Sequence, residues 1–204
     1  MKCIICARFK FWDLKTIKGT IFLFDPICQK CLENIKITPR MRVIDGISVY
    51  SFYRYDEVSM LIGSKYSIFG SRVLKILAKK ASEYFFESHN AHLWGKNEIY
   101  GLGIDDCIRS YYSHSAVILK EFCKYTFKPS YGALKAKNIV HYAGKTLQYR
   151  QNNPRNFIYK KDFKNVFIVD DIITTGTTIK EAKKVIEKTG TNVLFGIVLC
   201  DAKN

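Results

Sequence analysis

The strongest chemical signal in the sequence lies in residues 166–178, which read VFIVDDIITTGTT. Four apolar residues predict a buried parallel strand, and Asp170 and Asp171 follow at its end, where open α/β sheets bind their ligands. The threonine-rich loop around Gly176 then opens a helix, and its backbone N–H groups and hydroxyls suit a phosphate. Two adjacent carboxylates can bind ribose hydroxyls or orient Mg²⁺ through its waters. The alternative is an ordinary strand–turn–helix with a polar rim.

Cysteines supply a second chemical signal, at the N-terminus. Four of the seven form two Cys-x-x-Cys pairs: Cys3, Cys6, Cys28 and Cys31. In a reducing compartment this pairing favours a metal over disulfides, and two such pairs complete a tetrahedral zinc site. Four protein ligands leave no position open for chemistry, so we expect a structural zinc. The alternatives are a redox pair or accidental core cysteines. The other three cysteines lack this spacing and are predicted to be buried free thiols: Cys107, Cys123 and Cys200.

Strands that alternate with helices predict an α/β domain with a mostly parallel sheet flanked by helices. We expect a strand or hairpin at residues 46–55, strands at 97–104, 166–169 and 193–199, and helices at 57–86, 113–126 and 178–188. The first helical stretch should break near Gly63 or Gly70, and Thr178 with Glu181 has the spacing of a capping box. Residues 1–40 form a zinc-binding appendage, with a hairpin turning near residues 18–20, and residues 41–204 form the main domain.

Composition and charge narrow the class of protein. The 204 residues are 48% hydrophobic and 14% aromatic, which is typical of a globular chain and excludes wholesale disorder. Thirty-three Lys and Arg against 18 Asp and Glu give a net charge of +15, which favours anionic partners. No apolar run approaches a membrane-spanning helix, and Arg8 and Lys10 interrupt any signal-peptide core. We therefore expect a cytoplasmic protein.

Basic residues are concentrated in residues 120–165, which hold nine Lys and two Arg against Glu121 and Asp162. Lysine and arginine at this density can neutralise backbone phosphates, and the interleaved aromatics offer platforms for unpaired bases. The stretch therefore indicates single-stranded DNA as a partner, with five candidate contacts: Lys135, Lys137, Lys145, Arg150 and Arg155. The alternative is a solvated basic face whose aromatic side chains turn into the core.

The loop at residues 166–178 resembles the phosphoribosyl-pyrophosphate loop of type I phosphoribosyltransferases. Together with the four cysteines, it makes the chain similar to the ComF family of competence proteins over nearly its whole length. Residues 53–56, with Lys65-Tyr66 and Gly70, look like that family's aromatic strand and following helix. Arg109 with residues 112–116 resembles its helix entry, and Gln148, Arg155 and Asn156 echo a further family stretch. The chain departs from the family at residues 100–105, where YGLGID replaces the usual Pro-Val-Pro segment.

The resemblance implies a type I phosphoribosyltransferase fold and a ligand, phosphoribosyl pyrophosphate, bound with Mg²⁺. Asp170 and Asp171 would contact the ribose hydroxyls. Five residues would bind the 5′-phosphate: Thr174, Thr175, Gly176, Thr177 and Thr178. Residues 128–164 would form the mobile hood that such enzymes fold over their substrate. The sequence assigns no general base, since His114 and His141 are candidates by residue type alone, and it leaves open whether the chain is an enzyme.

Three functions fit this sequence. The first is a cytoplasmic handler of incoming single-stranded DNA in natural transformation, which the cysteines and the +15 charge favour. The second is a metabolic, salvage-type phosphoribosyltransferase that transfers phosphoribose to a base or amine. The third is a zinc-stabilised adaptor that docks a helicase or a DNA-uptake channel. The expected location of the protein is the cytoplasm or the periphery of the inner membrane.

Overall fold

The computed structural model describes residues 2–9, 25–89, 98–108, 111–138, 140 and 146–203. Its centre is a seven-stranded sheet in the order β1-β2-β9-β8-β4-β5, in which the short β3 also pairs with β9. The strands are β1 Arg40–Ile44, β2 Ile47–Ser51, β3 Tyr53–Arg54, β4 Ile99–Gly103, β5 Lys128–Pro129, β8 Asn165–Ile173 and β9 Asn192–Asp201. All pairings are parallel except the β1–β2 hairpin. The predicted α/β architecture with a mostly parallel sheet is confirmed.

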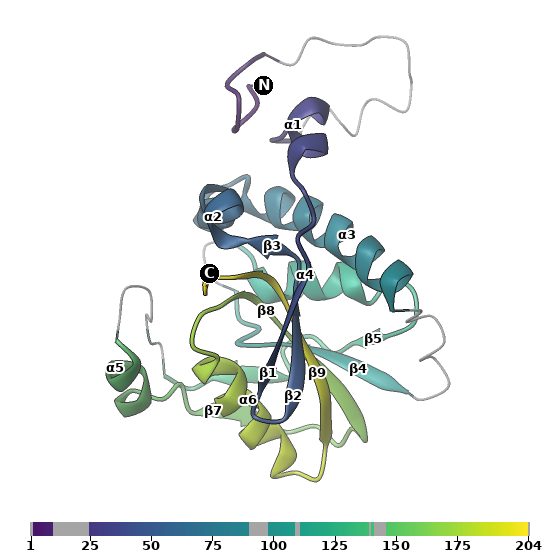
Figure 1. The fold of residues 1–204 in the computed structure, drawn as a ribbon. Helices are drawn as coiled ribbons and strands as arrows, with labels where there is room; N and C mark the ends of the chain where they lie inside the picture. The colour runs from purple at the N-terminus through teal and green to yellow at the C-terminus, as the bar shows by residue number, and fades with distance from the viewer. Residues whose placement is uncertain are drawn as a thin grey trace.

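Helices cover both faces of the sheet (Figure 1). One face packs against α2 Tyr55–Gly63, α3 Gly70–Ser88 and α4 His114–Phe122. The other face packs against α6 Thr177–Glu187 and a small antiparallel sheet of β6 Leu134–Ala136 and β7 Phe157–Tyr159. The chain also forms α1 Gln29–Asn34, the 3₁₀ turn η2 Ser64–Tyr66 and α5 Leu147–Asn152. No described helix is long and apolar enough to cross a membrane.

Strand β8 shows why the apolar run at residues 166–169 folds as a central strand. Phe167 and Val169 belong to the core on the α3 side, whereas Val166 and Ile168 belong to the core on the α6 side. Side chains of a strand alternate between faces, so a strand covered on both sides must be apolar at every position. The strand is longer than predicted and continues to Ile173. Asp170 and Asp171 therefore lie within the C-terminal part of β8, which still pairs with β9.

Several element boundaries differ from the sequence prediction. The break in the first helical stretch is confirmed, because α2 ends at Gly63 and α3 begins at Gly70. The strand or hairpin predicted at 46–55 is present as β2 and β3. Strand β2 pairs with β1 in a hairpin that turns at Asp45–Gly46, and β1 was missed. The proposed turn at residues 18–20 lies outside the described residues.

The predicted capping box at the start of α6 is wrong. The N-cap is Gly176, and no side chain bonds the first turn from that position. The Glu181 carboxylate instead accepts hydrogen bonds from the backbone N–H groups of Arg155 (3.2 Å) and Asn156 (2.6 Å). Glu181 therefore joins α6 to the segment before β7, a long-range contact that spacing within the helix cannot reveal.

Candidate functional site

Residues 174–176, which we call the threonine loop, join β8 to α6, and Gly176 is the residue that allows the chain to turn there. Gly176 has φ +81°, a conformation that side chains other than glycine rarely adopt. A Cβ atom there would also lie 2.9 Å from the Ile44 side chain. The Gly176 carbonyl accepts the Lys180 N–H at 2.9 Å, which starts the helix. The loop thus enters an 11-residue helix whose first N–H groups have no partner within the helix, as a phosphate site requires.

The β1–β2 hairpin holds this loop from the side. The Arg42 Nη1 atom donates to both the Thr174 carbonyl at 3.0 Å and Asp201 Oδ1 at 2.8 Å. Asp201 ends β9 and is buried. The Thr175 and Thr177 hydroxyls hydrogen-bond each other at 2.9 Å across Gly176. Sequence reasoning missed Arg42 and Asp201, because they lie far apart in the chain and meet only through the order of the strands.

The two carboxylates at the end of β8 differ in their surroundings. Asp171 Oδ2 lies 2.5 Å from the Lys65 ammonium, and both side chains are largely buried. The Asp170 carboxylate accepts the Asp171 N–H at 2.9 Å. Burial, followed by repulsion from Asp171, raises the pKa of Asp170 to about 7. Burial alone would lower the pKa of Lys65, but attraction to Asp171 and the hydrogen bond outweigh it, so that pKa is raised.

Asp170 should therefore make stability depend on pH. The folded-state pKa of about 7 exceeds the value of about 3.9 in an unfolded chain. Its stabilising contribution is full below about pH 4 and is lost as pH rises through 7. Relative to Asp170→Asn, whose amide cannot ionise, the wild type should lose roughly 1–3 kcal/mol of unfolding free energy between pH 5 and 8. Urea titrations at several pH values would measure this. Parallel profiles for the two proteins would contradict it, and the exposed Asp162→Asn is the control.

A second acidic pair follows β4, at the neighbouring strand end. Asp105 forms an ion pair with Arg155 at 3.2 Å and also accepts the Ala136 N–H at 3.0 Å. The buried Asp106 accepts from the Ser113 hydroxyl at 2.5 Å and from the Gly132 N–H at 2.6 Å. These carboxylates fasten α4 and the described part of residues 128–164 to the end of the sheet.

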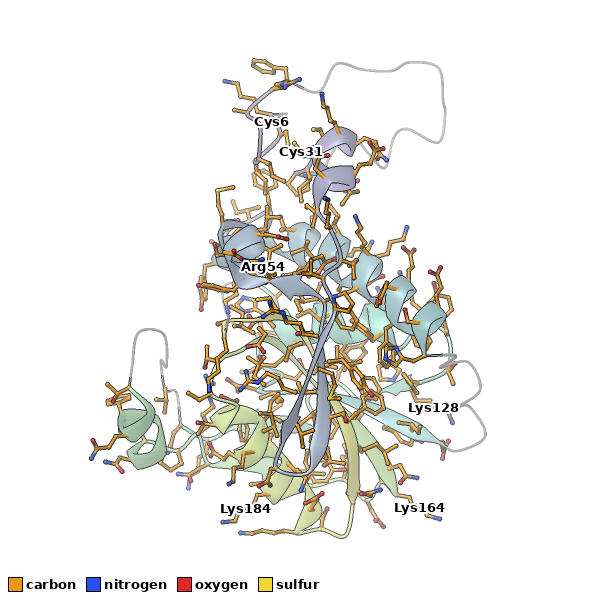
Figure 2. The ribbon with its side chains drawn as sticks, in the orientation of Figure 1. Cys6, Cys31, Arg54, Lys128, Lys164 and Lys184 are labelled. Atoms are coloured by element: carbon orange, nitrogen blue, oxygen red, sulfur yellow. The ribbon has the colours of Figure 1, made fainter. Side chains whose placement is uncertain are left out.

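The predicted DNA contacts fall into three groups. Lys135 and Lys137 are exposed, whereas the Arg155 guanidinium is mostly buried and paired with Asp105. Lys145 and the side chain of Arg150 lie outside the described residues. Other lysines, such as Lys164 and Lys184, project from the end of the molecule opposite the cysteines (Figure 2).

Most aromatic side chains of the basic stretch belong to the core, as the alternative interpretation supposed. Four are buried: Phe122, Phe127, Phe157 and Tyr159. Phe163 stacks on Tyr100 with ring centroids 3.9 Å apart. Three are exposed: Tyr125, Tyr131 and Tyr149.

Of the two histidines considered, His141 lies outside the described residues, as does Arg109. His114 begins α4, and its ring packs edge-on against Tyr66 at 5.4 Å and Tyr112 at 5.0 Å. His114 therefore packs against the two tyrosines that contact or adjoin Lys65.

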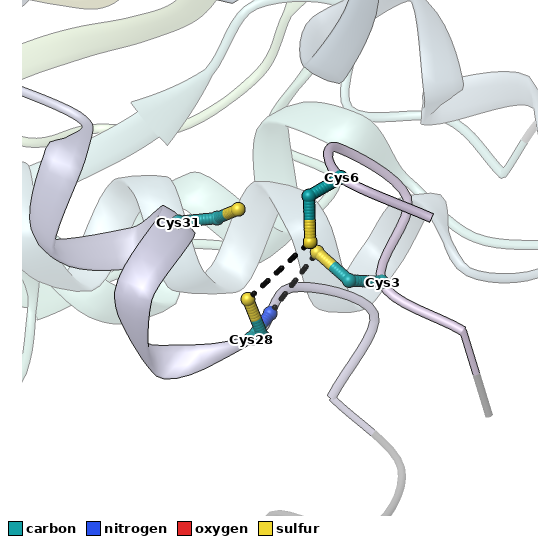
Figure 3. A group of neighbouring side chains, drawn as sticks. All are labelled: Cys3, Cys6, Cys28 and Cys31. Atoms are coloured by element: carbon teal, nitrogen blue, oxygen red, sulfur yellow. Dashed lines mark hydrogen bonds between the residues drawn. The ribbon is translucent and has the colours of Figure 1, made fainter. Parts of the chain in front are cut away.

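The four N-terminal cysteines come together at the end of the molecule beyond α2 and α3 (Figures 1 and 3). Their four sulfur atoms lie within 4.8 Å of one another. The Sγ atoms of Cys6 and Cys28 are 3.8 Å apart. Tetrahedral zinc with Zn–S bonds of about 2.3 Å requires sulfur separations of about 3.8 Å, so the donors fit such an ion.

Backbone groups already favour the thiolate form in this cluster. The Cys28 N–H donates to Cys3 Sγ at 3.3 Å. Burial opposes ionisation, but backbone N–H groups outweigh it and lower the pKa of Cys3 to about 6. The hydrogen bond with Cys28 raises the pKa of Cys31 to about 12. The remaining thiols differ from prediction in one case: Cys200 is buried and Cys123 partly buried, but Cys107 is exposed in the loop after β4.

Comparison with known proteins finds a family match over the segment that contains the threonine loop. Residues 134–204 match the phosphoribosyl transferase domain family. The matched stretch contains β8, the loop, α6 and β9, whereas Lys65 and the four clustered N-terminal cysteines precede it. Residues 134–204 are therefore phosphoribosyltransferase-like in sequence. No curated protein matches this sequence.

Solved structures with a similar fold are distant. A hypoxanthine phosphoribosyltransferase from Staphylococcus aureus shows 16% identity and a TM-score of 0.37, covering 63% of this chain and 62% of that one. A hypoxanthine-guanine phosphoribosyltransferase from Bacillus anthracis shows 17% identity and a TM-score of 0.36, covering 63% and 66%. An adenine phosphoribosyltransferase shows 16% identity and a TM-score of 0.38, covering 84% and 89%. The chain thus spans less than two thirds of the two hypoxanthine-type structures.

Proposed function

We propose that this protein binds phosphoribosyl pyrophosphate with Mg²⁺ and is a ComF-type competence protein that handles single-stranded DNA in the cytoplasm. The family match over residues 134–204 carries the first part, because it spans the loop at the end of β8. The DNA-handling part is supported by the net charge of +15 and by the clustered cysteines that accompany this loop in the family the sequence resembles.

In this proposal each part of the loop has a separate task. Threonine hydroxyls and the N–H groups at the start of α6 bind the 5′-phosphate. Asp170 and Asp171 accept hydrogen bonds from the ribose hydroxyls, for which carboxylates at the end of β8 are suited. Arg42 and Ile44 keep the loop in shape by fixing Thr174 and Gly176. Asp170 and Asp171 would hold Mg²⁺ through its waters, and the ion would supply positive charge that offsets the negative charge of the ligand.

We expect binding to single-stranded DNA without strong sequence preference, through the exposed basic surface that includes Lys135 and Lys137. Affinity should fall with salt at a log–log slope of about −0.7 per phosphate neutralised. Reversing both lysines to Glu should weaken binding and flatten that slope, measured by fluorescence anisotropy at several salt concentrations. Lys75→Glu, an exposed lysine on α3, is the matched control. Salt-independent affinity, or tighter binding to duplex, would contradict this expectation.

Deletion of the gene separates the proposed function from the salvage alternative. The proposal expects natural transformation to fall while growth on salvaged bases is unaffected. Loss of growth on a salvaged base with normal transformation would favour a metabolic phosphoribosyltransferase and overturn the competence role.

A further inference from the structure

Lys65 is the cation that touches the acidic pair of this site. It lies in η2, directly after α2, and is remote in sequence from the loop. Its Nζ atom is 2.5 Å from Asp171 Oδ2, and the side chains are only 15% and 13% exposed. The same ammonium lies 5.3 Å from the centre of the Tyr66 ring. The ion pair between Lys65 and Asp171 is therefore largely shielded from solvent.

The backbone around Lys65 is fixed by close packing. The Tyr112 hydroxyl donates to the Lys65 carbonyl at 2.7 Å. Gly70, at the start of α3, packs so tightly that a Cβ would lie 2.4 Å from the Ser64 carbonyl and 2.7 Å from Lys65 Cα. The Ser64 hydroxyl in turn bonds the Leu61 carbonyl at 2.6 Å. These contacts fix the backbone of Lys65, and the ion pair with Asp171 positions its ammonium.

Two described arginines near the loop pair with carboxylates outside the acidic pair. Arg42 pairs with Asp201 and Arg155 with Asp105. Phosphoribosyl pyrophosphate carries two anionic groups, and the threonine loop accounts for one of them, the 5′-phosphate. Its pyrophosphate is attached to the ribose next to the hydroxyls that the acidic pair would bind. A cation fixed at Asp171 is suited to meet this second anion, because charge-assisted hydrogen bonds to phosphate are strong in enclosed sites.

We propose that Lys65 is the specificity-determining cation of this site: it pairs with Asp171 in the free protein and binds the pyrophosphate group of the ligand. This inference rests on the proposed binding of phosphoribosyl pyrophosphate. Through Lys65 the protein distinguishes phosphoribosyl pyrophosphate from ribose 5-phosphate, which presents the same hydroxyls and 5′-phosphate without the pyrophosphate.

Calorimetric titration of Lys65→Met with both ligands, in the presence of Mg²⁺, tests this role. Methionine keeps the apolar stem and removes the charge. Affinity for phosphoribosyl pyrophosphate should fall about 30- to 100-fold, whereas affinity for ribose 5-phosphate should change less than about threefold. Lys75→Met, an exposed lysine on α3, should leave both affinities unchanged. Lys65→Gln, which retains a polar end, should reproduce the selective loss if the methionine variant does not fold.

The outcomes separate this inference from the function on which it rests. If the wild type binds neither ligand, the proposed function fails and the inference fails with it. If the wild type binds phosphoribosyl pyrophosphate but a folded Lys65 variant binds it equally well, the inference alone is wrong. An equal loss of both ligands would also overturn it, because Lys65 would then serve only to orient Asp171.

Discussion

A Cys28→Ser protein is expected to lose its zinc and the fold of the N-terminal appendage. Cys28 is central to the cluster, since its sulfur lies 3.8 Å from that of Cys6 and its N–H bonds the sulfur of Cys3. Helix α1 has only six residues and buries none of them, so it cannot be stable alone. Zinc binding contributes roughly 10–16 kcal/mol to the folding of small zinc peptides, so its loss should unfold this segment.

Metal content and limited proteolysis would measure the effect. The wild type should carry one zinc per chain, and the variant should carry almost none and be cleaved before β1. The α/β core should stay folded, because its two apolar clusters are built mainly by residues from Ile47 onward. Cys107→Ser, which removes an exposed thiol outside the cluster, should keep its zinc. Wild-type protein purified without chelator and free of zinc would refute the metal site.

An Asp171→Asn protein is expected to lose binding of phosphoribosyl pyrophosphate by at least about 100-fold. The substitution removes a carboxylate that would accept ribose hydroxyls and frees Lys65 from its partner. Removing one member of an enclosed ion pair typically costs about 3–5 kcal/mol, and the amide limits this cost by offering the ammonium an oxygen. Alanine would offer no such partner, so asparagine is the cleaner test.

The control for this variant is Asp56→Asn, in which the carboxylate lost is exposed and paired with Arg54. Circular dichroism should show that both variants remain folded, and calorimetry should show wild-type affinity for the control. Undiminished affinity of a folded Asp171→Asn protein would remove the acidic pair from the binding site.

Local sequence patterns were sufficient for the parts of the molecule built from neighbouring residues. The apolar run of β8 is buried on both faces, so its pattern alone predicted a central strand. The spacing of the cysteines predicted their cluster. The two cysteines of each Cys-x-x-Cys pair are close in sequence, so only the contact between the two pairs is long-range. Gly176 was singled out by its loop, and its positive φ confirms the need for glycine.

Contacts between distant segments could not be predicted in this way. Lys65 and Asp171 are 106 residues apart, and Arg42 and Asp201 are 159 apart. The Arg42–Asp201 pair depends on which strands become neighbours. The Lys65–Asp171 pair depends on where the segment after α2 packs against the sheet. A local sequence pattern predicts neither arrangement. Strand β1 was missed although Arg40-Met41-Arg42-Val43 alternates polar and apolar residues. It lies at the sheet edge, and its apolar side chains Met41 and Val43 are exposed.

The central claim is that the loop after β8 binds phosphoribosyl pyrophosphate with Mg²⁺, and titration of the wild-type chain tests it most directly. We predict saturable binding at one site per chain when Mg²⁺ is present and much weaker binding when it is removed by chelation. Absence of binding in Mg²⁺, or equal binding with and without it, would contradict the account.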